Sequence, residues 1–171
     1  LELGSSEEQR LRLMLANLEA RRGRYQEALE HLEIILKNNP DHSVAQYFCG
    51  RIHLQLKEYR QAEACLSAAL ESNGNIGPVL FDLGTLYQVT GRPQEAVEVY
   101  ERLLALNPGD TAAIERIITL YVELGKHELA EHHIDYLKEI TDEGGPERQV
   151  IGLVYLKQGR YDQAVEELEA V

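Results

Sequence analysis

One alanine recurs every 34 residues along the chain, and this interval restricts the possible folds more than any other feature of the sequence. The five positions are Ala28, Ala62, Ala96, Ala130 and Ala164, with no insertion between them. Five residues before each alanine stands a glycine or a lysine, and Tyr25, Tyr59 and Tyr161 stand three residues before their alanines. Such a period indicates stacked copies of one supersecondary unit that cannot bury its apolar face alone.

Each unit has the pattern of two short helices. Apolar residues are spaced three or four apart, which places them on one face of a helix. In the first unit the two stripes are Leu11, Leu15 and Leu18, then Ala28, Leu32 and Ile35. A glycine such as Gly23 ends the first helix, and Asn39–Pro40 ends the unit. We therefore expect an all-α fold of about ten helices, each antiparallel to the next because the turns are short.

Small residues recur where two helices of a pair would cross. Closely crossing helices need a small side chain at the crossing, and the recurring alanine supplies one. Within the first helices the equivalent small residues are Ala16, Gly50, Gly84 and Gly152. The fourth unit departs from the pattern, with Ile118 in the small position and His127 in place of the tyrosine. We expect looser or shifted helix packing in that unit.

These residues and their period resemble the tetratricopeptide repeat (TPR) family, over residues 9–171. The family pattern has a small residue in its first helix, glycine, tyrosine and alanine around the turn, and proline near the end of the unit. The resemblance implies a right-handed superhelical solenoid of antiparallel helix pairs, with a concave groove that binds a peptide or a helix of a partner protein. The units would be 9–42, 43–76, 77–110, the divergent 111–144 and the truncated 145–171, after a leader at 1–8.

Charge and hydropathy limit the kinds of partner. The net charge of −12 makes a nucleic-acid partner improbable on electrostatic grounds and favours a basic or neutral protein. No apolar run approaches the roughly 18 residues that a membrane span requires, so we expect no membrane insertion. Because the chain begins at Leu1 and ends within a helical pattern at Val171, we expect it to be a fragment of a larger protein.

The sequence offers little catalytic chemistry, and we expect no enzyme, no cofactor and no bound metal. The residues nearest to a metal-binding pattern are His127, Glu131, His132 and His133. Adjacent His132 and His133 point in different directions on a helix, so a solvated helix face is the better interpretation. Cys49 and Cys65 fit small apolar core positions, while a disulfide or a reactive thiol stays open as an alternative. Two cysteines favour a reducing, cytoplasmic compartment.

The resemblance implies that the first helices of the pairs line the groove. In the first unit this face holds Arg10, Leu13, Met14, Asn17, Ala20 and Arg21. The predicted partner-binding residues are Tyr47, Phe48, Arg51, Phe81, Asp82, Thr85 and Arg116. Aromatic residues and arginine are the side chains that most often anchor a partner. The alternative is that Tyr47, Phe48 and Phe81 only pack between neighbouring helices.

One known TPR subclass grips the carboxylate of chaperone tails with lysine, asparagine and arginine at fixed places. This chain has only Asn17 in one register and only Arg116 in the other, so the sequence argues against that partner. A more apolar partner segment suits the groove better.

The last helix has an apolar stripe of Val165, Leu168 and Val171 with no sequence after it to cover the stripe. We therefore expect end-to-end self-association through this face, giving a homodimer. A self-association module, or the regulatory arm of a larger protein, is accordingly the alternative to a partner-binding scaffold.

Overall fold

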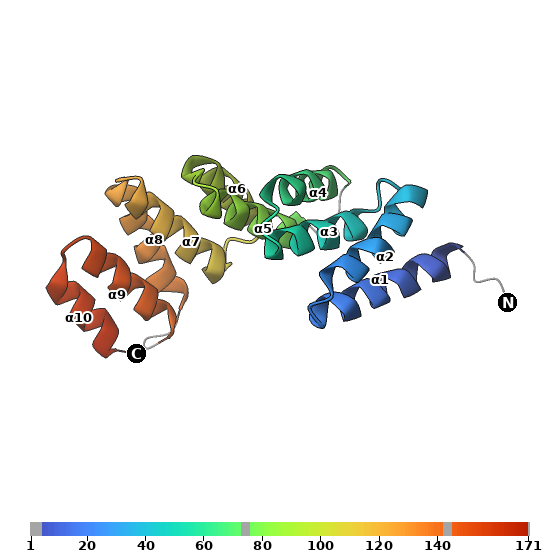
Figure 1. Cartoon of the computed structure of the whole chain (residues 1–171). Coiled ribbons are helices and arrows are strands. Elements are labelled where there is room, and N and C mark those ends of the chain that lie inside the picture. The colour runs from blue at the N-terminus through green and yellow to red at the C-terminus, as the bar shows by residue number, and fades with distance from the viewer. Residues whose placement is uncertain (1–4, 73–75, 142–144, 171) are drawn as a thin grey trace. The chain divides into compact units, whose positions relative to one another are not determined.

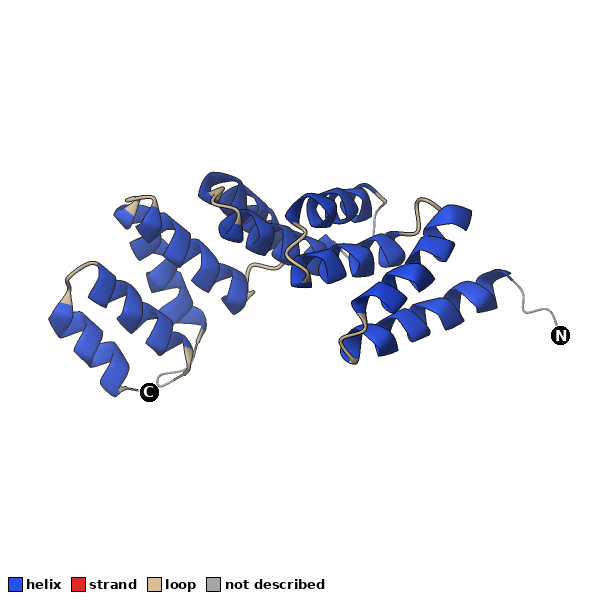
Figure 2. Cartoon of the chain, in the orientation of Figure 1, coloured by secondary structure: helices blue, strands red, loops and turns tan. Residues whose placement is uncertain are grey.

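The computed structural model of the chain describes residues 5–72, 76–141 and 145–170. Within those residues all regular structure is helical (Figures 1 and 2). The chain divides into two compact units, Leu1–Thr90 and Gly91–Val171. The expected all-α architecture of antiparallel pairs is confirmed, with ten helices in the described part of the chain.

The first unit holds helices α1 to α5. Their bounds are α1 Ser5–Arg21, α2 Tyr25–Asn38, α3 Ser43–Gln55, α4 Tyr59–Glu71 and α5 Ile76–Val89. The helical structure begins four residues before the first predicted repeat, inside the segment predicted as a leader, whose residues 1–4 lie outside the described residues. Glu7 and Glu8 favour this early start because negative charge stabilises the first turn of a helix. Arg12 also donates to Glu8 one turn along the helix.

The second unit holds helices α6 to α10. Their bounds are α6 Pro93–Leu106, α7 Thr111–Glu123, α8 His127–Ile140, α9 Glu147–Lys157 and α10 Tyr161–Glu169. Pro93 occupies the first turn of α6, where the missing N–H has no intrahelical partner to lose. Asp110 caps α7 by accepting a hydrogen bond from the backbone of Ala113 at 3.1 Å. The second helices of the pairs thus begin at residues 25, 59, 93, 127 and 161, in the period of the sequence.

The turn inside each pair contains one residue in the left-handed backbone region. Four of these are glycines, Gly23, Gly91, Gly125 and Gly159, and the fifth is Lys57 at φ 60°. In the second pair the Lys57 N–H donates to the Leu54 carbonyl and the Glu58 N–H donates to the His53 carbonyl. This is the hydrogen-bond pattern of a Schellman turn. The backbone therefore keeps one turn geometry even where a lysine replaces glycine.

The small residues lie at the helix crossings, as the repeat pattern predicted. All five recurring alanines are completely buried. A Cβ added to Gly50 would lie 2.6 Å from Cγ of Leu66, and one added to Gly152 would lie 2.7 Å from Cγ of Leu168. Gly84 is also buried. At Gly50 and Gly152, a larger side chain would require the leucine packed against it to move.

The divergent fourth unit accommodates its isoleucine in the core. Ile118 is fully buried in a cluster with Ile134 and Tyr155. Helices α7 and α8 pack less closely along their length than α3 and α4, as expected for a pair with a large residue at the crossing. The isoleucine contributes apolar contacts where the other pairs have a close backbone approach.

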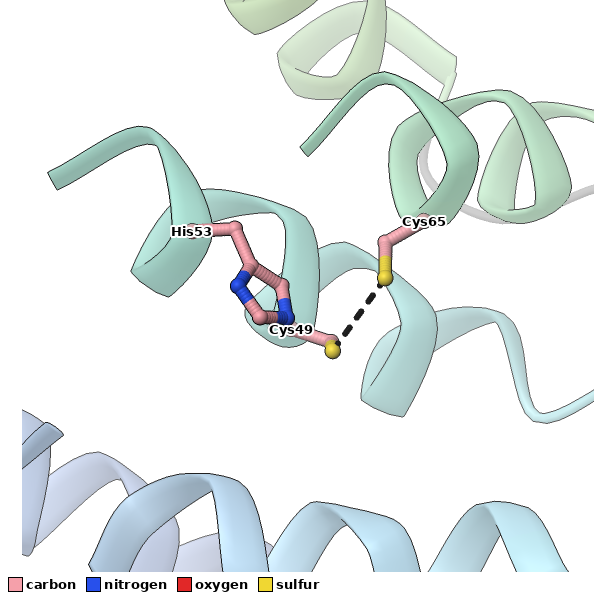
Figure 3. A group of neighbouring side chains, drawn as sticks. All are labelled: Cys49, His53 and Cys65. Carbon is pink, nitrogen blue, oxygen red and sulfur yellow. Dashed lines mark hydrogen bonds between the residues drawn. The ribbon is translucent and has the colours of Figure 1, made fainter. Parts of the chain in front are cut away.

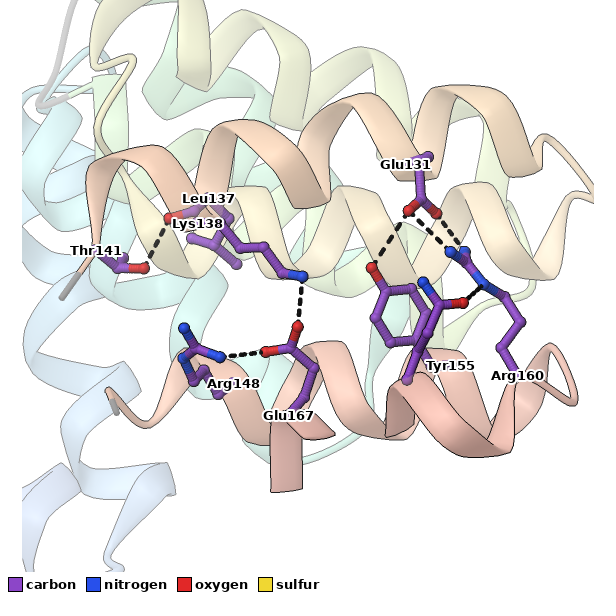
Figure 4. A network of polar contacts seen from close by, with 9 residues as sticks. Glu131, Leu137, Lys138, Thr141, Arg148, Tyr155, Arg160 and Glu167 are labelled. Atoms are coloured by element: carbon purple, nitrogen blue, oxygen red, sulfur yellow. Dashed lines mark hydrogen bonds and ion pairs between the residues drawn. The ribbon is translucent and has the colours of Figure 1, made fainter. Parts of the chain in front are cut away.

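Ion pairs connect α8, α9 and α10 in the second unit (Figure 4). The carboxylate of Glu167 is only 4% exposed, and it pairs with Lys138 and, at 2.9 Å, with Arg148. At the other end of these helices Glu131 accepts hydrogen bonds from Arg160 and from the Tyr155 hydroxyl, the latter at 3.2 Å. The network satisfies a buried charge, which would otherwise be costly to bury.

No described helix combines the length and the hydrophobicity that crossing a bilayer requires.

Candidate functional site

Two adjoining hollows open between α1 and α3 in the first unit. The larger, of about 560 Å³, is lined by Leu11, Leu13, Met14, Leu15, Asn17, Leu18, Arg21 and Phe48. The smaller, of about 230 Å³, is lined by Asn17, Ala20, Arg21, Tyr25, Phe48, Arg51, Ile52 and Gln55. Asn17, Arg21 and Phe48 line both, so the two hollows form one continuous depression, which we call the α1–α3 groove.

Phe48 is the central side chain of the α1–α3 groove. It is half-buried, with part of its ring packed against the core of the first unit and part facing the hollows. Met14 is 63% exposed, and Arg21 and Arg51 are also exposed. The groove therefore combines apolar walls with two arginines, a pairing that suits the recognition of a partner's side chains.

A second group of side chains links α3 to α5. Nε of Arg51 lies 3.5 Å from Oδ2 of Asp82, and its guanidinium lies 5.7 Å from the centre of the Tyr47 ring. The ring centres of Tyr47 and Phe48 are 5.9 Å apart. Burial raises the pKa of Asp82, although Arg51 and a hydrogen bond with Tyr47 act to lower it. Burial, together with the charge of Asp82, also raises the pKa of Tyr47.

These contacts bear on the two interpretations of Tyr47. The Tyr47 ring lies against Arg51 and the charge of Asp82 on α5 acts on its hydroxyl, an environment compatible with packing between neighbouring first helices. Arg51 joins this packing group to the α1–α3 groove, since it contacts Asp82 and also lines the smaller hollow.

Within the first unit, six residues of the predicted binding set lie on two helices, three on α3 and three on α5. Phe81 and Thr85 are half-buried on α5, and the Thr85 hydroxyl donates to the Phe81 carbonyl at 3.0 Å. Arg116 is exposed on α7 in the second unit.

The predicted set left out the α1 residues that form most of the groove. Leu13, Met14, Asn17 and Arg21 line the hollows. Their positions in the repeat place these residues on the face that lines the groove. The sequence therefore contained the information needed to predict them. The predicted set instead lies entirely in the second to fourth units.

The tyrosines of the repeat differ in environment. Tyr25 packs against the core of the first unit, and Tyr59 is half-buried. Tyr161, predicted to have the same structural role, is 68% exposed. The described residues after α10 supply no further helix against which its ring would pack.

The residues of the predicted apolar stripe on the last helix differ in how they are exposed and packed. Val165 on α10 is 50% exposed. Leu168 packs over Gly152 of α9 while remaining partly exposed, and Val171 lies outside the described residues. Val165 and Leu168 are therefore both exposed on α10, although the Leu168 side chain also contacts the crossing with α9.

The histidine-rich face of α8 has other contacts. Glu131 is bound by Arg160 and Tyr155. His133 stacks on Tyr121 with ring centres 5.6 Å apart, and burial lowers the pKa of its imidazole. Glu131 and His133 therefore contact residues of neighbouring helices, whereas the sequence predicted a solvated helix face.

A second group of potential metal ligands lies between α3 and α4. The sequence did not predict that these residues lie together. Cys49, His53 and Cys65 each place a ligand atom within 4.8 Å of the others (Figure 3). The two sulfur atoms are 3.2 Å apart, within thiol hydrogen-bonding distance. The hydrogen bond between the two thiols lowers the pKa of Cys65, with burial opposing this effect, and together with burial it raises the pKa of Cys49. The 16-residue separation of the cysteines concealed this group, because only the packing of α3 on α4 brings them together.

Comparisons with known proteins agree with the helix pairs. Tetratricopeptide repeat family models match residues 19–76 and 90–149, residues 50–111, and residues 148–171. The solved structure of YrrB, described as a TPR protein with an unusual peptide-binding site, superposes with a TM-score of 0.76 at 22% identity, covering 93% of this chain and 82% of that one. A TPR protein from Parabacteroides merdae superposes with a TM-score of 0.85 at 20% identity, covering 95% of this chain and 65% of that one.

Two curated relatives are much longer than this chain. Protein O-mannosyl-transferase TMTC1 of Homo sapiens is 27% identical over 130 residues, which are 75% of this chain and 14% of that protein. Phagocyte signaling-impaired protein of Drosophila pseudoobscura pseudoobscura is 28% identical over 117 residues, which are 68% of this chain and 12% of that protein. The chain thus spans about an eighth of the length of these relatives. With the family models matching most of its length and helix pairs in the same period, the chain belongs to the tetratricopeptide repeat family, whose members are generally non-catalytic scaffolds that bind peptides or proteins.

Proposed function

We propose that this chain is a non-catalytic scaffold that binds an apolar peptide or helix of a partner protein in the α1–α3 groove. The observation that carries the proposal is the continuous depression lined by Met14, Phe48 and the arginines Arg21 and Arg51. The peptide-binding site of YrrB, a protein of the same fold, supports the class of ligand.

The chemistry of the groove favours an amphipathic partner segment. Apolar side chains at helical spacing would enter the larger hollow and bury Met14 and Phe48. Backbone carbonyls or a carboxylate of the partner would accept hydrogen bonds from Arg21 and Arg51. The net charge of −12 favours basic residues elsewhere in the partner, since these speed its association with an acidic surface.

A displayed peptide library selected on the immobilised chain tests the proposal. Apolar sequences should be enriched, and a selected peptide should bind in fluorescence anisotropy. Met14→Asp should weaken this binding about tenfold or more, because it places a charge at the floor of the larger hollow. The exposure of Met14 makes the substitution compatible with folding.

Leu106→Asp provides a matched control, because Leu106 on α6 is exposed to a similar degree and lies outside the groove. Helicity measured by circular dichroism should be equal in both variants. Failure to enrich any peptide, or an equal loss of binding in both variants, would contradict a binding role for the groove.

The exposed side chains of Val165 and Leu153, at the C-terminal end of the second unit, favour self-association as a second proposal. Sedimentation equilibrium of the chain over a range of concentrations tests it. A dimer that dissociates in Val165→Lys supports this second function, and a wild-type monomer at every concentration excludes it.

A further inference from the structure

The group formed by Cys49, His53 and Cys65 has the donor atoms of a soft-metal site. Its ligand atoms lie within 4.8 Å of one another, and the two sulfur atoms are 3.2 Å apart. Ligand atoms around one tetrahedral zinc ion lie about 3.5–3.8 Å apart, given Zn–S near 2.3 Å and Zn–N near 2.0 Å. Small side-chain rotations are therefore sufficient to close the three ligands around an ion.

The imidazole of His53 is held in a way that suits a metal ligand. Its Nδ1 forms a 2.6 Å hydrogen bond with Oε2 of Glu58, which leaves Nε2 as the remaining donor atom. Figure 3 shows the ring beside the sulfur atoms of both cysteines. Metal-binding histidines typically use their second ring nitrogen for such a contact with a carboxylate, which fixes the ring orientation.

The backbone turn between α3 and α4 positions Glu58 for this contact. The Glu58 N–H donates to the His53 carbonyl at 2.9 Å, so the two residues are joined through the backbone as well as through their side chains. Lys57, in its left-handed conformation, directs the chain into this arrangement. The contact between Glu58 and His53 is thus part of the fold of the turn.

Burial and charge also suit a cation. Cys49 belongs to the core of the first unit, while Cys65 and His53 are only partly buried, so an ion can reach the site from solvent. Two thiolates and an imidazole select zinc or copper(I) over magnesium or calcium.

We propose that Cys49, His53 and Cys65 bind one Zn²⁺ ion, with Glu58 as the residue that orients His53. The ion forms bonds to both sulfurs and to Nε2, and the two thiol protons are released to solvent. Water completes the tetrahedral coordination, as in zinc sites with three protein ligands. Both cysteines are free thiols in this structure, and a disulfide between them is the outcome from which the test below distinguishes the metal site.

Titration of the reduced, metal-free chain with Co²⁺ and then Zn²⁺ tests the site. Cobalt should give thiolate charge-transfer bands and the intense visible bands of a tetrahedral ion at one equivalent, and Zn²⁺ should displace it. Cys65→Ser and His53→Gln should abolish these bands. Glu58→Gln should keep them and weaken Zn²⁺ affinity about ten- to a hundredfold, as expected for a residue that orients a ligand.

His132→Gln is the matched control, because it removes a histidine outside the site and should leave both titrations unchanged. Protection of both wild-type thiols from alkylation by Zn²⁺ provides a measurement that needs no variant. Absence of one-equivalent binding by the reduced chain would overturn the proposal. So would cobalt bands that persist in Cys65→Ser, or a spontaneous Cys49–Cys65 disulfide together with no metal affinity.

Discussion

Lys57 is the residue whose backbone departs most from what its side chain prefers. It has φ 60°, in a turn position that is glycine in the other four repeats. Holding a residue with a Cβ in this left-handed conformation destabilises the folded state by roughly 1–2 kcal/mol. Glycine has no such penalty, but it loses more conformational entropy on folding. The repeat register places Lys57 at the turn position that glycine occupies in the other repeats, although lysine itself does not favour this backbone.

Replacing Lys57 with glycine should stabilise the chain by about 0.5–1 kcal/mol, the difference between these two effects. Urea denaturation followed by circular dichroism measures the change. Lys57→Ala removes the same side chain but keeps the Cβ, so it should give no stabilisation. Equal stabilisation by both variants would mean that the lysine side chain, and not the backbone, is unfavourable.

The carboxylate of Glu131 makes the second unit sensitive to acid. Hydrogen bonds from Arg160 lower its pKa below the ordinary value of 4.5, so the folded state holds the charged form more strongly than the unfolded state does. The stability that the Glu131 carboxylate contributes is fully present at a pH above its ordinary pKa. It is lost as the pH falls through the lowered pKa of the folded state. Thermal denaturation of wild type and Glu131→Gln should show a difference in Tm at pH 7 that shrinks steadily below pH 4.5. A constant difference at all pH values would exclude this role.

The helix pair is the element whose geometry the sequence predicted best. The crossing residues and the starts of the second helices follow the 34-residue period. The predictions from the sequence were wrong where the outcome depended on how one helix packs against another. Leu11 and Leu18, read as a buried stripe, remain exposed in the wall of a hollow, because Ala16 faces the core instead.

Sites formed by several helices were correspondingly harder to predict. The groove face of α1 followed from repeat geometry, but its depth depends on how α1 lies against α3, which periodicity does not specify. The association of Cys49 with Cys65 depends on the rotation of α3 relative to α4. Helical spacing alone assigns each residue to a face of its own helix.

Gly50 allows α3 and α4 to approach closely, and its replacement by alanine should destabilise the chain by about 1–2 kcal/mol. The added Cβ would lie 2.6 Å from Cγ of Leu66, and the resulting strain outweighs the higher helix propensity of alanine. Urea denaturation measures the loss. Gly109→Ala is the control, because a Cβ there meets nothing within 4 Å and should change stability little.

At the scale of the whole molecule, the repeat architecture confines each perturbation to its neighbourhood. In repeat proteins stability is approximately a sum of terms for single repeats and for nearest-neighbour interfaces. The division into Leu1–Thr90 and Gly91–Val171 is consistent with such local cooperativity.

Hydrogen exchange of the Gly50→Ala variant tests this locality. Amides of α3 and α4 should exchange faster, while those of α9 and α10 should keep wild-type protection. Uniform loss of protection along the chain would show that the two units unfold as one.

The evenly spaced left-handed turns also affect how such a chain can change in length. Because Gly23, Lys57, Gly91, Gly125 and Gly159 occupy equivalent places, removing one period joins two identical turn geometries. Joining residue 57 directly to residue 92, for example, retains a turn that enters a second helix in the original register. Recombination or gene duplication can therefore shorten or extend the array in steps of 34 residues without requiring a new kind of junction.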